Sequence, residues 1–590
     1  MLFLDDDSPE ILLGTHREHG FEVSLPLEAF TKTHTHLLGS TGTGKTFFLA
    51  HLAQRFINEG YGVILLDGVG QAYELIRDQL FWNQYPVDRF DLVDPTSNRM
   101  PGINYLELVG DQNNTTPETW APVVLQGLKK MFREGDERRV WLEKYGLMAL
   151  IPLIRQGFTL MELGRFVSGV DPALREAILA REPNRDLARM WNEFARMKPS
   201  DQSERIGSTE TRGDILALDA PPLQRLLGQK RTSIDWRRVM DESGVVLADC
   251  RRGGLLTNTG SEVLGTVLMD QIVRTAYDRP VGTSKPCFVI ADEFQRFVSP
   301  DFSDALTALR NYGVYFVLSH QLLEHLDSVP TLRASVETNC KNKLVFSVSA
   351  ADAEVLTDNL WAARSFPYYR VKKEIDRTYF EPRETTREVH SCGRAHADSL
   401  GAGSSEAFSY DTSPLIFGPV QSPFMGTGSS SMKGSVDIYS ENKSVVPFHE
   451  LIKRQELSSI SFYSHEETRH WLRGSIIDQD QRECLAKIGP NPPVPLRTVE
   501  YERAPMSEEL RQLRLGKLTA KYLTHQEIDV ARRKRVPEFL QAQPQQHENR
   551  HEIFQPQPEE EDSDDGLSAR QAATPTGAPA KLDRSRRDRS

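Results

Sequence analysis

The stretch from Gly39 to Thr46 constrains this chain more than any other part of its sequence. It reads Gly39-Ser40-Thr41-Gly42-Thr43-Gly44-Lys45-Thr46 and fits G-x-x-x-x-G-K-[ST], the phosphate-binding P-loop pattern. Glycines allow the positive φ angles with which backbone N–H groups curl around a polyphosphate. Lys45 would reach the β and γ phosphates, and the Thr46 hydroxyl would bind Mg²⁺. The pattern therefore predicts a site for ATP and Mg²⁺.

The segments on either side of this loop have the order that a P-loop needs. Residues 33–38 alternate polar and apolar side chains as a strand does, and residues 47–60 read as a helix. The N-terminal dipole of that helix would favour an anion. A plain glycine turn between a strand and a helix is the alternative, and it is disfavoured because all three elements fall in the right order.

Length and composition place the chain among multidomain globular proteins. It has 590 residues, of which 39% are hydrophobic and 26% charged, with a net charge of −12. This balance argues against a generally basic nucleic-acid binder, although an acidic protein can still carry a locally basic groove. The five cysteines have no C-x-x-C spacing and predict neither a disulfide framework nor a zinc set. No signal peptide or membrane span is apparent, so we expect a cytoplasmic location.

Apolar, β-branched runs that end in polar residues predict a parallel sheet. Such runs recur with intervening helices, which is typical of a sheet with helices on both faces. They are residues 33–38, 61–67, 90–95, 243–249, 287–293, 314–321 and 343–348. The sequence thus predicts an α/β fold, a RecA-like P-loop parallel sheet.

Helical periodicity interrupts this sheet between residues 115 and 238. Apolar residues fall three and four apart, and Thr159 to Glu162 fits a capping box. The predicted division is an N-terminal part of the ATPase core (1–114), an all-α insertion (115–238), a C-terminal part of the core (239–365), an irregular linker (366–440), a small C-terminal region (441–538) and a disordered tail (539–590).

The C-terminal third of the chain carries weaker signals. Residues 349–440 read as irregular, and the Gly- and Ser-rich stretch 399–435 as loop or linker. Helices are expected at 507–521 and from the capping box Thr524 to Glu527. Beyond about residue 540 the chain is rich in Gln and Pro and then acidic, a composition that cannot bury enough apolar surface to order itself.

Five residues outside the loop are candidates for catalysis or metal binding, the fifth weaker than the others. Asp292 and Glu293 end an apolar strand, where Asp292 would hold Mg²⁺ and Glu293 would act as general base on the attacking water. Gln321 ends a neighbouring strand and could contact the γ-phosphate or that water. Arg310 lies before the same strand, as a candidate arginine finger toward a neighbouring subunit or an ordinary surface arginine. Arg252 is a weaker candidate for the same role.

These motifs resemble the HerA/FtsK superfamily of DNA-pumping ATPases, and within it the coupling proteins of type IV secretion and conjugation (the VirD/TraG/TraD-like group). The most specific part is the pair Asp292-Glu293-Phe294-Gln295 and Ser319-His320-Gln321, together with the P-loop. The resemblance covers residues 30–360. It implies a hexameric ring with DNA through its centre, Arg310 as a finger acting in trans and Gln321 as a sensor.

The resemblance does not determine which protein partner the chain binds or in which cellular process it acts. Coupling proteins of that group usually begin with transmembrane helices, which this sequence lacks, so any inner-membrane recruitment would need partners. A relaxase or secretion-channel component is expected in conjugation, and a nuclease if the chain is a soluble HerA-type helicase in repair or defence. An ATP-gated assembly scaffold that pumps nothing is a third alternative.

Basic residues alone give little evidence for DNA. The cluster Arg532-Arg533-Lys534-Arg535 and the pair Lys372-Lys373 are more typical of solvated surface than of a binding site. A ring of six subunits nevertheless needs only a few lysines or arginines per subunit to hold one duplex. The prediction of DNA as partner therefore comes from the resemblance.

Overall fold

An eleven-stranded sheet forms the centre of the fold. The computed structural model describes residues 9–108, 115–131, 139–168, 172–299, 302–329, 331–361, 371–397 and 436–542. The strands lie in the order β2 (Glu22–Pro26), β1 (Glu10–His16), β14 (Val494–Thr498), β13 (Glu483–Lys487), β10 (Asn342–Val345), β3 (Thr35–Leu38), β9 (Val314–His320), β8 (Cys287–Asp292), β4 (Gly62–Asp67), β7 (Val245–Asp249) and β5 (Phe90–Val93).

The strands from β10 to β5 are all parallel to their neighbours. They are the strands that the apolar runs predict, and they carry continuous apolar sequence because parallel strands are buried on both faces. In β4, for example, every residue is buried. The predicted α/β fold with a parallel sheet is confirmed.

Helices cover both faces of this sheet. Side chains of successive strand residues point to opposite faces, so Leu37 and Leu65 belong to one core while Leu38 and Leu66 belong to the other. The first core contains residues of α2 (Lys45–Asn58) and α3 (Gln71–Trp82). The second contains residues of α12 (Asn258–Tyr277), α13 (Phe302–Ala308) and the insertion. The P-loop thus leaves the sheet toward the face that α2 covers.

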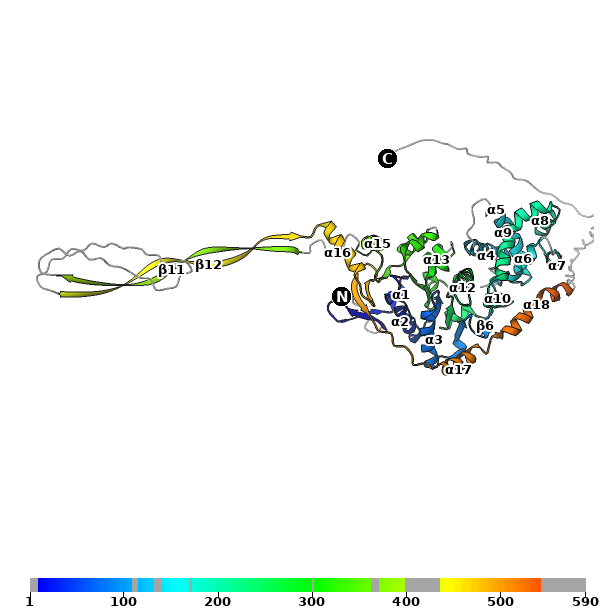
Figure 1. The fold of residues 1–590 in the computed structure, drawn as a ribbon, viewed down its shortest axis with the longest axis horizontal. Helices are drawn as coiled ribbons and strands as arrows, with labels where there is room; N and C mark the ends of the chain where they lie inside the picture. Colours follow the sequence, from blue (N-terminus) through cyan, green and yellow to red (C-terminus); the bar gives the residue numbers. More distant parts are fainter. Residues whose placement is uncertain are drawn as a thin grey trace, which may run out of the picture. The chain divides into compact units, whose positions relative to one another are not determined.

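The insertion consists of helices in the part of residues 115–238 that the structure describes, as predicted (labels α4 to α10 in Figure 1). Thr159 and Glu162 form the predicted capping box. The helices are α4 (Pro117–Met131), α5 (Arg139–Arg155), α6 (Leu163–Val167), α7 (Ala173–Leu179), α8 (Arg185–Ala195), α9 (Pro199–Leu218), α10 (Pro221–Leu227) and α11 (Trp236–Asp241). Three shorter helices complete the core: α1 (Glu28–Thr31), α14 (Leu332–Asn339) and α15 (Ala350–Leu360).

The chain beyond residue 480 returns to the central sheet, which the sequence did not predict. β13 pairs antiparallel with β10, and β14 joins β13 to β1. The region 441–538 therefore shares its sheet with the core, and residues up to Ala542 group into one unit. The tail was predicted to begin at residue 539, but residues 539–541 are helical and Phe539 packs against Phe158; the remainder beyond Ala542 lies outside the described residues.

A long antiparallel ribbon differs from the predicted irregular segment. β11 (Val371–Ala397) pairs along its length with β12 (Val436–Phe462), as Figure 1 shows. The ribbon was not predicted because charged residues and prolines interrupt the alternation of polar and apolar residues on both strands. The predicted Gly- and Ser-rich linker 399–435 lies outside the described residues. The next helix, α16 (His465–Ile477), binds α15 through the ion pair of Arg469 with Asp358 at 2.7 Å.

Residues 499–542 form an arm that runs back along the core, and we call them the C-terminal arm. It contains α17 (Glu508–Thr519), β15 (Leu523–Thr524) and α18 (His525–Gln541), and the predicted capping box of Thr524 and Glu527 is present. β15 pairs with β6 (Arg99–Met100). Ion pairs add to this attachment, including Arg225 with Asp529 at 2.9 Å.

Two kinds of feature are absent from the described residues. Within them, no helix combines the length and the apolar character that a bilayer crossing requires. The same residues contain no cluster of His, Cys, Asp and Glu arranged to hold a metal ion.

The contribution of β13 and β14 to the sheet can be tested by truncation. A chain ending at Ala542 keeps every described strand and should retain its thermal unfolding midpoint within about 2 °C. A chain ending at Asp478 lacks both strands, so β10 and β1 would present open edges, and we expect it in the insoluble fraction. Circular dichroism melting of the soluble protein is the measurement. Equal solubility and melting of the two chains would contradict the role of β13 and β14.

Candidate nucleotide-binding site

The predicted P-loop connects β3 to α2 at the carboxyl edge of the sheet. Gly42 and Gly44 have φ angles of 82° and 106°, which a side chain would disfavour. A Cβ at Gly39 would lie 2.6 Å from Cβ of Phe346, so only glycine fits there. In the part of the chain that the structure describes, the backbone N–H groups of residues 41–44 have no protein acceptor. Backbone N–H groups without acceptors, gathered in one loop at a helix N-terminus, can donate hydrogen bonds to a bound anion.

Lys45 lies at the first turn of α2 with 7% of its surface exposed. Its ammonium group donates hydrogen bonds to the carbonyl oxygens of Gly39 and Ser40, the second at 2.9 Å. Burial lowers the pKa of Lys45, and the charges of Asp292 and Glu293 oppose this shift. The charged lysine therefore lies within electrostatic reach of both predicted acidic residues.

The register of the sheet brings three aspartates to one edge. Asp67 ends β4 and lies opposite Asp249 of β7 on one side and Asp292 of β8 on the other. Burial, followed by the charge of Asp67, raises the pKa of Asp292 to about 7. The Ser319 hydroxyl, which donates to Asp292 at 2.7 Å, and Lys45 oppose this shift. Asp292 is thus a buried carboxylate next to the P-loop lysine.

Glu293 follows directly and has an unusual backbone. Its φ angle is 55°, a left-handed conformation that is uncommon for a residue with a side chain. Gln295 Nε2 donates to its carboxylate at 2.8 Å. Strained residues of this kind persist where surrounding contacts hold them, and they cluster at functional sites.

The two other predicted catalytic residues lie at opposite edges of the sheet. Gln321 follows the carboxyl end of β9, and the hydroxyl of Thr41 in the P-loop donates to its side-chain oxygen at 3.2 Å. Arg310 precedes the amino end of β9, where its Nη1 donates to the carbonyl oxygen of Lys32 at 3.2 Å. The structure therefore brings Gln321 to the P-loop and leaves Arg310 outside this chain's site.

Two arginines flank the carboxyl edge. Arg252 is exposed in the loop after β7. Arg296, which sequence reasoning did not single out, donates to the carbonyl oxygen of Gly68 at 3.1 Å and to the hydroxyl of Ser261 at 2.8 Å. The position of Arg296 three residues after Glu293 was the available sequence signal.

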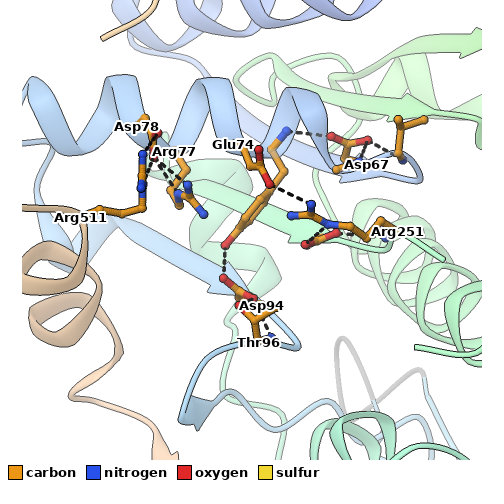
Figure 2. A network of polar contacts seen from close by, with 12 residues as sticks. Asp67, Glu74, Arg77, Asp78, Asp94, Thr96, Arg251 and Arg511 are labelled. Atoms are coloured by element: carbon orange, nitrogen blue, oxygen red, sulfur yellow. Dashed lines mark hydrogen bonds and ion pairs between the residues drawn. The ribbon is translucent and has the colours of Figure 1, made fainter. Parts of the chain in front are cut away.

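Asp67 anchors the helix next to the site. Its carboxylate accepts hydrogen bonds from the backbone N–H groups of Val69, Gly70 and Tyr73 at 2.7–2.8 Å, at the start of α3 (Figure 2). Burial raises its pKa, while these three donors lower it. Asp67 therefore acts as the cap of α3 as well as the neighbour of Asp292.

A polar network continues from Asp67 along α3. Arg251 binds Glu74 through Nη1 at 2.8 Å, as Figure 2 shows, and its Nε lies 2.7 Å from the carboxylate of Asp249. The hydroxyl of Tyr73 donates to Asp94 at 2.8 Å. At the far end of α3, Arg511 of the C-terminal arm donates from Nε and Nη2 to Asp78 at 3.1 and 2.8 Å.

The C-terminal region also reaches the P-loop itself, which the sequence did not indicate. The N–H of Arg482 donates to the carbonyl oxygen of Thr43 at 2.8 Å. A Cβ at Gly44 would lie 3.3 Å from Cα of Arg482. The φ angle therefore favours glycine at this position, and the close approach of another backbone segment leaves little room for a side chain.

Three histidines are buried in the sheet: His36 of β3, His320 of β9, and His34, which precedes the amino end of β3. The Nε2 atoms of His36 and His320 are 2.6 Å apart, and His320 Nδ1 is 2.8 Å from the carbonyl oxygen of Leu322. A carbonyl can only accept, so His320 donates from Nδ1 and accepts from His36. Burial lowers the pKa of His320 to about 3 and that of His34 to about 4. Burial also lowers the pKa of His36 well below its ordinary value, so all three are neutral near pH 7.

The donor set fits a magnesium nucleotide. The free N–H groups of the loop and Lys45 would hold phosphate oxygens, and Thr46 with Asp292 would hold Mg²⁺. The metal would neutralise charge on the terminal phosphates. Together the strand, the loop and the buried acids define a P-loop protein of the parallel α/β class.

The comparison with protein families agrees with this class. Residues 11–112 match the family model described as helicase HerA, central domain. This match confirms the predicted resemblance to the HerA/FtsK superfamily in the segment that holds β3, the P-loop, α2 and α3. No curated protein matches the sequence.

Several solved structures are similar to the chain. A bacterial conjugative coupling protein, TrwBdeltaN70 in its unbound form, is 13% identical with a TM-score of 0.46, covering 82% of this chain and 89% of its own. TrwB with ADP and Mg²⁺ is 14% identical with a TM-score of 0.44, covering 85% and 98%. VirB4 of Thermoanaerobacter pseudethanolicus is 14% identical with a TM-score of 0.37, covering 62% and 90%.

The buried histidines predict a pH dependence of stability. His34 has a folded pKa of about 4 against an ordinary value of 6.5, so the unfolded chain binds more protons between these values. Its contribution to stability is complete above pH 6.5 and is lost as the pH falls toward 4. The difference in unfolding free energy between wild type and His34→Gln should shrink by about 1 kcal/mol from pH 6.5 to 5.5.

Urea unfolding of both chains at several pH values measures this difference, and the comparison cancels the opposite contributions of the buried aspartates. Parallel stability curves for the two chains would show that His34 is not held neutral by the fold.

Proposed function

We propose that this chain is an ATP-hydrolysing motor that forms rings and translocates DNA, in the manner of a conjugative coupling protein working in the cytoplasm. The observation that carries the proposal is the convergence of Lys45, Asp292 and Glu293 at one edge of the parallel sheet. Lys45 would bind the β and γ phosphates, and Glu293 would accept the proton of the attacking water. The match to the HerA central domain supports a DNA-directed motor.

The other predicted residues take supporting roles in this proposal. Thr46 and Asp292 would hold Mg²⁺, and Gln321 would sense the terminal phosphate from the position that its contact with Thr41 gives it. A relaxase or a secretion-channel component is the expected partner. TrwB, one of the proteins similar in structure, is a bacterial conjugative coupling protein, in agreement with the setting that the sequence motifs suggested.

A HerA-type helicase that acts with a nuclease is the second candidate. The family match to helicase HerA favours it, since that match lies across the P-loop itself. Recovery of a nuclease rather than a relaxase with the tagged protein would favour this alternative over conjugative transfer.

ATP turnover with and without DNA tests the motor. We expect duplex or single-stranded DNA to raise the ATPase rate of wild type. Lys45→Ala should lose nucleotide binding because the charge that meets the phosphates is gone. Glu293→Gln should keep ATP bound and lose hydrolysis by at least about 10²-fold, since an amide cannot accept the proton. Fluorescent-nucleotide binding and phosphate release are the measurements.

Slow turnover that DNA does not change would instead indicate the ATP-gated scaffold. Normal turnover by Glu293→Gln would show that another group is the base.

Arg310 can serve this reaction only across a subunit boundary. β9 has seven residues between it and Gln321, which separates the two ends by about 23 Å at 3.3 Å per residue. The Nε atom of Arg310 is buried without a hydrogen-bond partner in the described structure. The guanidinium is held by one hydrogen bond, from Nη1 to the carbonyl oxygen of Lys32. A guanidinium with spare donors at the amino edge could reach the nucleotide of a neighbouring subunit in a ring.

Mixed rings test this assignment. Arg310→Ala should bind ATP and hydrolyse almost none, because arginine fingers contribute about 10³–10⁵ in rate. Mixing it with Lys45→Ala, itself inactive, should restore part of the activity at interfaces that pair an intact P-loop with an intact finger. ATPase is measured across mixing ratios at concentrations where native mass shows rings.

Arg310→Lys is the matched control, since it keeps the charge and loses the planar fork of donors. Activity that stays at zero in confirmed mixed rings would contradict action in trans. Full activity of Arg310→Ala alone would remove Arg310 from the reaction.

A further inference from the structure

The basic run of residues 532–535 divides into two pairs on α18. Arg532 Nη2 donates to Gln224 at 2.9 Å, and Arg535 Nη1 donates to Glu162 at 2.9 Å. These two arginines face the core and fix α18 on the base of the insertion. Arg533 and Lys534 are exposed to solvent. Only half of the run is therefore available to a ligand.

Lys534 lines a cavity of about 740 Å³ between the insertion and the C-terminal arm. Three segments that are distant in the sequence form its walls: residues 156–158, residues 228–233 and residues 521–539. Its size falls within the range of ligand-binding pockets and is far larger than an inorganic phosphate needs. Four of its basic residues are exposed, which opens it to solvent: Lys230, Arg231, Lys521 and Lys534.

The walls of this cavity are held in place by buried polar contacts. The side chains of Arg535 and Glu162 are only 12% and 9% exposed. Tyr522 is buried and donates its hydroxyl to Asp91 at 2.5 Å. A site that is fixed before binding loses less entropy when a ligand arrives.

Five basic side chains and one acidic side chain line the cavity. Carboxylates outside it bind three of the bases: Glu107 binds Arg231 at 2.9 Å, Asp91 binds Lys521 at 2.6 Å, and Glu162 binds Arg535. Within the described residues, Lys230 and Lys534 have no ion pair, and Glu538 is the acid that lines the cavity with them. The cavity keeps a positive charge after these pairs are counted.

The position of Lys230 is set by its backbone. Asn104 Nδ2 donates to the carbonyl oxygen of Lys230 at 3.0 Å. Cε of Lys230 lies 3.2 Å from the place of a Cβ on Gly157, so the glycine leaves room for the lysine along the cavity wall. The two lysines thus come from different wall segments, one fixed on the core and one on α18.

We propose that this cavity binds phosphate groups of a nucleic-acid strand through Lys230 and Lys534. Ammonium groups without carboxylate partners are the chemistry that contacts a phosphodiester backbone, and an open cavity lets the chain enter and leave. The proposal rests on the proposed DNA motor and names where a strand would contact it outside the nucleotide site.

The test compares the full-length double variant Lys230→Gln/Lys534→Gln with wild type. Fluorescence anisotropy of a labelled 30-nucleotide strand and of the matching duplex gives Kd between 50 and 300 mM salt. Each lost phosphate contact lowers the slope of log K against log salt by about 0.7 for single strands and 0.9 for duplex. We expect a slope lower by about 1.4–1.8 and binding weakened about 10- to 30-fold at 0.15 M salt.

Arg533→Gln is the matched control, because it removes a neighbouring charge of α18 that does not line the cavity. We expect it to keep the wild-type slope, and thermal melting should show that all variants are folded. A double variant with the wild-type slope would overturn this assignment while leaving the motor intact. Wild type that binds no DNA at low salt would overturn the proposed function as well.

Competition with inorganic phosphate at constant ionic strength tests whether the cavity binds a nucleic-acid strand or a single phosphate group. We expect millimolar phosphate to leave the oligonucleotide bound, because one phosphate fills a small part of the cavity. Displacement at that concentration would overturn the assignment to a strand.

Discussion

The burial of opposite charges at the carboxyl edge of the parallel sheet is the constraint on which the rest of this structure depends. Lys45 and Asp292 are both nearly inaccessible to solvent, and a buried charge is costly unless another charge or a hydrogen bond compensates it. The register of β4 and β8 sets the distance of Asp292 from Asp67, and the P-loop sets the position of the lysine. A shift of β8 against β9 would separate Asp292 from the Ser319 hydroxyl and leave a buried polar group without its hydrogen bond.

The chain stabilises this edge with segments that are far away in the sequence. Arg482 binds the P-loop through its backbone, and Arg511 binds the far end of α3 through a fork of two hydrogen bonds. Bidentate pairs of arginine with a carboxylate fix direction as well as distance. The C-terminal third is therefore part of the support of the site, even though its strands lie at one side of the sheet.

The sequence predicted the parallel strands and the P-loop because both carry local patterns. A strand buried on both faces reads as a continuous apolar run, as in residues 61–67, and the P-loop has fixed glycine positions. β13 and β14 were not predicted, since each has five residues with charges or prolines among them and finds its place only through pairing with β10 and β1. The ribbon of β11 and β12 was missed for the same reason: its two strands are defined by their pairing with each other, and neither has a clear alternation of polar and apolar residues.

The sequence predicted the individual residues of the candidate site but not the contacts between them. The types and positions of Lys45, Asp292 and Glu293 follow from motifs, whereas the contact of Thr41 with Gln321 depends on how β3 and β9 lie side by side. The histidine pair His36 and His320 belongs to the same two strands, and only their register shows that the rings meet. The spacing of residues within one segment predicts which chemical groups a site contains. Contacts between residues on different strands can be predicted only when the order and register of the strands are known.

Asp67 shows how this sheet order connects the site to the C-terminal arm. One carboxylate receives three backbone N–H groups at the start of α3 and faces Asp292 across the strand pair. A charge that changes at Asp292 acts on Asp67, because the two groups share a buried, low-dielectric environment. Asp67 holds the first turn of α3, and Asp78 in the second half of the helix holds Arg511. The helix is therefore fixed in both halves by carboxylates, one belonging to the candidate site and the other to the surface where the arm attaches.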